Sequence, residues 1–104
     1  MDRLTQLKQF AFEEPDDPFN LYALALEFLK NDPAEASQLF ETLTRRHPHY
    51  LPTYYPYAHL LIERKEPTKA EQVFQQGIET ARMQQDYKTL KELQAAYTDW
   101  GYDR

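Results

Sequence analysis

The 104-residue sequence has no cysteine, only two glycines and no long apolar run. The lack of cysteine excludes a disulfide framework and thiolate chemistry. With so little glycine and no Ser/Gly tract, no flexible linker is evident, and a single domain over residues 1–104 is predicted. No segment approaches the roughly 20 apolar residues of a membrane-spanning helix, and no signal peptide is evident at the N-terminus. We therefore expect a soluble, cytoplasmic protein.

Positive charge is also scarce. Twelve Lys and Arg residues stand against seventeen Asp and Glu residues, which gives a net charge of -5 without any basic stripe. Binding to nucleic acid and to an anionic membrane surface both require clustered positive charge. We therefore expect neither as a partner.

Residue sets for catalysis and metal binding are missing as well. The sequence has no glycine-rich phosphate loop and no Ser/His/Asp or Cys/His combination, so neither an enzyme nor a bound cofactor is expected. His47 and His49 suggest a metal site with His59 as a third ligand. However, the first two flank a turn proline and a whole helix separates them from His59, so solvated turn histidines are favoured and no metal site is predicted.

The sequence does contain one pattern of apolar residues that occurs twice. Ala25 and Ala58 lie 33 residues apart, and Ala36 and Ala70 lie 34 residues apart. A fixed period of this size predicts stacked helical hairpins, with the small alanines allowing close approach of paired helices. The first copy consists of Leu21, Leu24, Ala25, Phe28, Ala36, Phe40 and Pro48, and the second of Tyr54, Tyr57, Ala58, Leu61, Ala70 and Phe74.

Proline and Asp/Asn punctuation divides the chain into about six helices, and no run shows the two-residue period of a strand. The short loops make successive helices antiparallel neighbours. We predict an N-terminal half-unit helix in residues 1–15, a first repeat in 17–48, a second repeat in 50–85 and a C-terminal capping helix in 86–100.

Individual residues mark the expected helix ends. Asn31 should end the second helix in a left-handed conformation, and Gly101 should end the last. Pro56 lies inside the expected fourth helix, so that helix either starts late, with Pro56 in its donor-poor first turn, or kinks there; the late start is favoured. The expected N-cap residues are Asp2, Asp17, Asp32 and Asp86.

The repeated pattern resembles the tetratricopeptide repeat (TPR) family, whose W-x2-L-G-x2-Y…A-x3-F…P pattern both copies match in residue type. Leu21 and Tyr54 replace the tryptophan, Ala25 and Ala58 replace the glycine, and Arg82 stands at the second proline. The resemblance implies an all-α fold in which antiparallel helical hairpins stack as a short right-handed solenoid.

The resemblance also implies a binding surface, because the first helices of the family's hairpins line a concave face that binds peptides. Here that face would suit an apolar peptide or helix with an acidic end near two lysines. The expected peptide-binding residues are Phe19, Tyr22, Leu26, Leu29, Tyr55, His59, Ile62, Lys88 and Lys91.

Two functions remain open for this face. The first is a protein-binding adaptor or scaffold whose partner the sequence does not name. The second is a structural self-association module, a homodimer formed through the same face, because exposed apolar patches mark either kind of contact. Some family members clamp acidic chaperone tails with lysine and asparagine, but here Tyr22, Tyr55, Leu26 and His59 stand at those positions, so that specificity is not expected.

Overall fold

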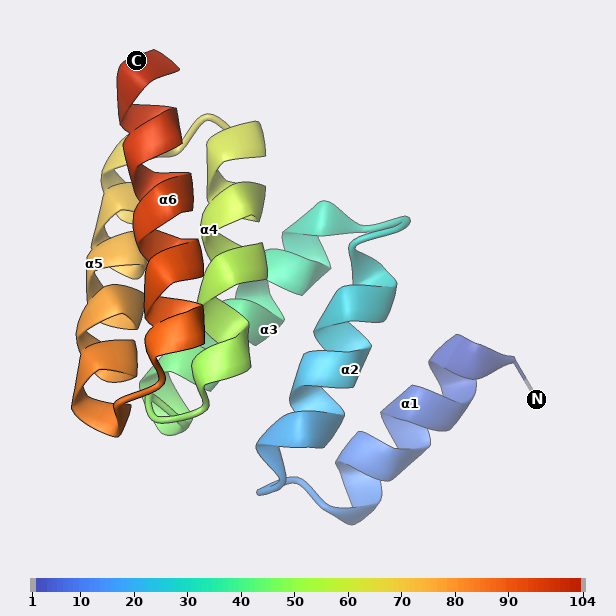
Figure 1. Ribbon diagram of the computed structural model, residues 1–104. Coiled ribbons are helices and arrows are strands. Elements are labelled where there is room, and N and C mark those ends of the chain that lie inside the picture. Colours follow the sequence, from blue (N-terminus) through green and yellow to red (C-terminus); the bar gives the residue numbers. More distant parts are fainter. Residues whose placement is uncertain (1, 104) are drawn as a thin grey trace. The chain divides into compact units, whose positions relative to one another are not determined.

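The computed structural model describes residues 2–103, with side chains described as far as Gly101. Six α-helices fill this range: α1 (Arg3–Glu13), α2 (Pro18–Phe28), α3 (Pro33–Arg46), α4 (Tyr54–Glu63), α5 (Pro67–Gln84) and α6 (Tyr87–Asp103) (Figure 1). A short 3₁₀ helix, η1 (Leu51–Thr53), precedes α4. No strand occurs within residues 2–103, so the predicted all-α fold is confirmed. None of the described helices is both long enough and apolar enough to cross a bilayer.

Aspartate side chains cap the starts of four helices, as the sequence predicted. In each case a carboxylate oxygen accepts a hydrogen bond from a first-turn backbone N–H, which would otherwise lack a partner within the helix. Each cap therefore fixes a helix start locally, before any tertiary contact is considered. The pairs are Asp2 with Thr5 (2.7 Å), Asp17 with Phe19 (2.9 Å), Asp32 with Glu35 (3.2 Å) and Asp86 with Thr89 (3.1 Å).

Pro56 is accommodated by a late helix start. Residues 51–53 form the 3₁₀ turn and α4 begins at Tyr54, which makes Pro56 the third residue of the helix. A backbone N–H at that position has no partner within the helix, so the missing proton of proline costs no hydrogen bond.

Two expected helix ends were wrong. Asn31 is not left-handed; its N–H and that of Asp32 both donate to the Phe28 carbonyl, at 3.1 and 2.7 Å, so a continued right-handed turn already satisfies that carbonyl. Gly101 does not end α6, which continues to Asp103. A left-handed helix end would require a positive φ at Gly101, and no described glycine has one. The left-handed positions are instead Lys65 and Gln85, which directly follow the turns ending α4 and α5.

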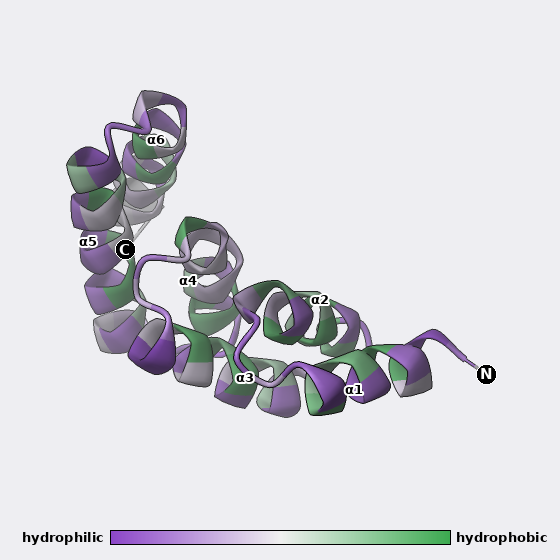
Figure 2. Cartoon of the chain, turned by 90° about the horizontal axis from the view of Figure 1, so that it is seen from below, coloured by the Kyte–Doolittle hydropathy of each residue, from purple (hydrophilic) through white to green (hydrophobic). Residues whose placement is uncertain are grey.

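The described chain divides into two compact units, residues 1–53 and residues 54–104. In the first unit, α2 and α3 form an antiparallel hairpin through the fully buried Ala25, Ala36 and Phe40. The helix α2 is rich in apolar residues, and much of it is green in Figure 2. The helix α1 packs beside α2 through the buried Leu7.

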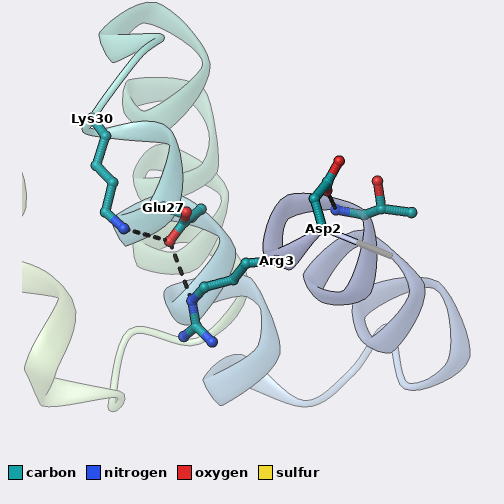
Figure 3. A network of polar contacts seen from close by, with 5 residues as sticks. Asp2, Arg3, Glu27 and Lys30 are labelled. Carbon is teal, nitrogen blue, oxygen red and sulfur yellow. Dashed lines mark hydrogen bonds and ion pairs between the residues drawn. The ribbon is translucent and has the colours of Figure 1, made fainter.

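An ion-pair network also ties α1 to α2. The Arg3 guanidinium lies 3.3 Å from the Glu27 carboxylate, which also contacts the Lys30 ammonium at 3.0 Å (Figure 3). The hydrogen bond from Lys30, followed by the attraction of Arg3, lowers the pKa of Glu27 below its ordinary value of 4.5. Because the cations Arg3 and Lys30 are exposed, the network supplements the apolar contact of Leu7 and does not replace it.

In the second unit, α4 and α5 form the equivalent hairpin and α6 packs against α5. Ala58, Ala70 and Phe74 are fully buried, in the same manner as their counterparts in the first unit. Gly77 in α5 allows a further close contact, because a Cβ atom added there would lie 2.6 Å from Tyr54 Cβ and 3.2 Å from Leu93 Cδ1. The absent side chain at position 77 therefore lets both Tyr54 and Leu93 reach the core.

Candidate functional site

A cavity of about 290 Å³ opens on the second unit between residues of α4 and α6. The lining residues of α4 are spaced i, i+4, i+7 and those of α6 are spaced i, i+3, i+4, so each helix contributes a single stripe. The walls combine aromatic and aliphatic side chains with one carboxylate. The lining residues are Tyr55, His59, Ile62, Ala96, Asp99 and Trp100.

The aromatic walls are held in place by Phe74 of α5. Its fully buried ring meets the His59 ring edge-on, with centroids 6.4 Å apart, and lies 5.8 Å from the Trp100 ring. It also stacks on Tyr97 at 5.3 Å. Because Phe74 belongs to the repeated core pattern, the core that builds the hairpin also positions the cavity walls.

Two polar groups of the cavity lack partners among the described residues. The Nε2 atom of His59 is buried and has no hydrogen bond. The Asp99 side chain is exposed, with no ion pair or hydrogen bond to any described residue. Buried polar atoms are normally paired, so this nitrogen, which is closed to solvent, is an exception among the described residues.

Tyr55 forms the outer wall of the cavity. It is 44% exposed, and its ring centroid lies 4.5 Å from that of His59 in a tilted arrangement. A large aromatic side chain this exposed, adjoining a cavity, is the kind of residue that dominates protein-binding surfaces.

The first unit presents the expected residues of α2 differently. Phe19 is 59% exposed, while Tyr22, Leu26 and Leu29 are half-buried. The ring of Tyr22 meets that of Tyr50 edge-on at 5.7 Å, and burial raises the pKa of both phenols. These residues form the apolar side of α2.

A hollow of about 350 Å³ does exist in the first unit, at the turn between α3 and η1. Its residues are Pro18 and the segment 46–50, not the expected residues of α2. The Arg46 guanidinium there is already paired with Asp16 at 3.2 Å. Within the described residues, no three His, Cys, Asp or Glu side chains gather closely enough to hold a metal ion.

The binding face predicted from the sequence shares three residues with this cavity, Tyr55, His59 and Ile62. In the last helix, sequence reasoning pointed to Lys88 and Lys91, which are exposed on the first turns of α6 and do not line the cavity. The three residues that it missed carried a signal, since they share one helical stripe and include the chain's single tryptophan: Ala96, Asp99 and Trp100.

Comparison with known families identifies the family to which this fold belongs. A family model described as tetratricopeptide repeat matches residues 27–93. The chain belongs to the tetratricopeptide repeat family. TPR domains generally mediate protein–protein interactions, and TPR proteins are generally non-catalytic scaffolds.

Two solved structures of a TPR domain protein from Salinibacter ruber are similar to this chain. The solution NMR structure is 41% identical, covers 83% of this chain and 88% of its own, and superposes with a TM-score of 0.78. The crystal structure is 42% identical, covers 80% of this chain and 93% of its own, and has a TM-score of 0.75. No curated protein matches the sequence significantly.

Proposed function

We propose that this TPR protein is an adaptor that binds a segment of another protein at the cavity between α4 and α6. The single observation that supports this site is a cavity with aromatic walls and two unpartnered polar groups, His59 Nε2 and the Asp99 carboxylate. Such a combination supplies both apolar contact area and orientation for a bound side chain.

The remaining residues of the expected peptide-binding face would extend the contact. Within the second unit, Lys88 and Lys91 are exposed on α6 and would attract an acidic stretch of the partner. Within the first unit, the exposed Phe19 and its half-buried neighbours on α2 would offer a further apolar contact. Contacts at the border of a surface contribute less than buried aromatic anchors, so the cavity is proposed as the principal site.

Self-association through the same face is the second candidate. It is favoured by the exposed aromatic side chains of that face, since Phe19 and Tyr55 are 59% and 44% exposed. A second copy of the chain would cover such side chains. Light scattering over a concentration series separates the two candidates, because a dimer that resists dilution supports self-association and a monomer supports the adaptor.

The site is tested with the double variant Tyr55→Glu/Ile62→Glu. Two carboxylates at the cavity would have to be desolvated on binding, so capture of protein partners from a lysate of the source organism should be lost. Circular dichroism should show unchanged helicity, because Tyr55 is exposed and Ile62 is only half-buried.

The matched control adds the same two charges elsewhere. Gln72→Glu/Met83→Glu places them at exposed positions of α5 that do not line the cavity. This control should capture the same partners as the unmodified protein. Equal capture by the cavity variant would show that the site is wrongly placed.

A further inference from the structure

We propose that the α4–α6 cavity recognises an arginine side chain of the partner segment, an inference that rests on the proposed function. Two features of the cavity favour a planar cation. They are its aromatic walls and the Asp99 carboxylate, which has no partner among the described residues.

The aromatic walls favour a cation because the faces of aromatic rings carry partial negative charge. Tyr55 and Trp100 stand on different helices and border the same opening. Phe74 packs 5.8 Å from the Trp100 ring and so fixes that wall in place. A guanidinium can stack on such rings while its aliphatic stem covers Ile62 and Ala96.

The carboxylate of Asp99 supplies the charge complement. No described residue pairs with it, and a carboxylate accepts two parallel hydrogen bonds from a guanidinium. Lys91, the nearer of the two lysines on α6, precedes Asp99 by eight residues, about 12 Å along the helix axis. That separation exceeds the screening length of about 8 Å at physiological salt.

The neighbouring charges of α4 do not oppose a cation. Glu63 follows the cavity residue Ile62 and is exposed. Arg64 is paired with Glu66 at 3.4 Å, so its positive charge is locally compensated. Lys65, which follows Arg64, is also exposed and offsets Glu63, so the end of α4 adds no net charge near Asp99.

The chemistry of the cation favours arginine over lysine. A guanidinium offers five N–H donors in a rigid, planar fork, so it can bond a carboxylate with one edge while it stacks on an aromatic wall. A lysine ammonium, as a strongly hydrated point charge, would lose more hydration on entering the cavity.

The chain carries its own reporter for this test, since Trp100 is its single tryptophan and lines the cavity. We would titrate the full chain with acetyl-Leu-Arg-Leu-amide and follow Trp100 fluorescence, together with the indole N–H signal by NMR. The comparison peptides carry citrulline, which keeps the planar shape without charge, or norleucine, which keeps only the stem. The arginine peptide should bind about tenfold more tightly than the citrulline peptide. Added salt should weaken this preference.

Asp99→Asn tests the assignment of the carboxylate. Because Asp99 is exposed, the variant should fold normally, which circular dichroism checks, and its preference for arginine over citrulline should disappear. The matched control is Glu92→Gln, which removes the same charge from an exposed position of α6 outside the cavity and should leave the preference unchanged.

The outcomes separate this inference from the proposed function. Equal binding of all three peptides, or a preference that survives Asp99→Asn, would overturn arginine recognition while an apolar binding site stands. Absence of any Trp100 response to the three peptides would also overturn it. The proposed function is decided independently, by partner capture with the Tyr55→Glu/Ile62→Glu variant.

Discussion

The two units of this TPR protein share one hairpin design but hold their third helix differently. In the first unit α1 has a single buried side chain, Leu7, and leaves Phe10 and Phe12 exposed. In the second unit α6 also has one buried side chain among the described residues, Leu93, but its Tyr97 and Trp100 are half-buried against Phe74. A helix beside a hairpin can thus be attached lightly or built into the core.

The same sequence position takes opposite environments in the first unit. Phe10 precedes Leu43 by 33 residues and is its counterpart in the repeat pattern. Leu43 is fully buried because α3 is paired with α2, whereas Phe10 is 52% exposed on α1. Burial at a repeat position therefore depends on whether a partner helix covers it, and the residue type alone does not decide it.

The attachment of the third helix bears on the proposed binding site. The helix α6 contributes three of the six residues that line the cavity of the second unit, whereas the α1 of the first unit lines neither of the cavities described above. The tightly packed helix is therefore the one that carries candidate binding residues, consistent with the need for a rigid support under a binding site.

The largest effect in this comparison is expected for the substitutions Phe74→Ala and Phe40→Ala. Both rings are fully buried at equivalent repeat positions, so each substitution should lower the free energy of unfolding by about 3–5 kcal/mol. Phe74 contacts Trp100, with ring centroids 5.8 Å apart, so Phe74→Ala should also change Trp100 emission in the absence of denaturant. Denaturant titration and tryptophan fluorescence measure the two effects. Unchanged emission in Phe74→Ala would contradict the role of Phe74 in holding the cavity wall.

An intermediate effect is expected at the glycine of α5. Gly77→Ala would bring a Cβ atom to 2.6 Å from Tyr54 Cβ, an atom fixed to the backbone, so the helices must separate and stability should fall by about 1–3 kcal/mol. Gly101→Ala is the matched control, since nothing lies within 4 Å of its added Cβ and α6 is helical there. That control should stabilise the protein by up to about 1 kcal/mol, through helix propensity. Thermal unfolding of both variants measures the two changes in stability. A change in the same direction for both variants would contradict the close contact at Gly77.

The smallest effect is expected in the first unit, where α1 depends partly on an ion pair. Because the folded state lowers the pKa of Glu27, its carboxylate contributes stability above about pH 4.5, and this contribution disappears as the pH falls through the lower folded pKa. Glu27→Gln should therefore weaken α1 slightly at pH 7 and make no difference once Glu27 is protonated. Amide hydrogen exchange in α1 at both pH values measures this. Glu14→Gln, an exposed carboxylate of the same unit, is the control, and an equal response of both variants would argue against the Arg3–Glu27 contact.

Local signals in the sequence predicted most of the fold. The four aspartate caps, the late start of α4 and the alanine contacts each depend on residues close in sequence or on the repeat period, and the structure contains all of them. The helix ends at Asn31 and Gly101 could not be predicted in this way. Their backbone conformation depends on which carbonyls the following residues already satisfy, and residue type does not reveal that.

For the proposed binding surface, the sequence alone determined that α4 would present Tyr55, His59 and Ile62 together, because one helical stripe fixes their spacing. Only the tertiary structure decided which stripe of α6 joins them. A helix of 17 residues offers several such stripes, and its rotation is set by Leu93 against Gly77 and by Tyr97 and Trp100 on Phe74. Those contacts turn Ala96, Asp99 and Trp100 toward the cavity. The spacing of residues within a helix follows from the sequence, whereas the rotation of a helix against its neighbours is decided only when the core is assembled.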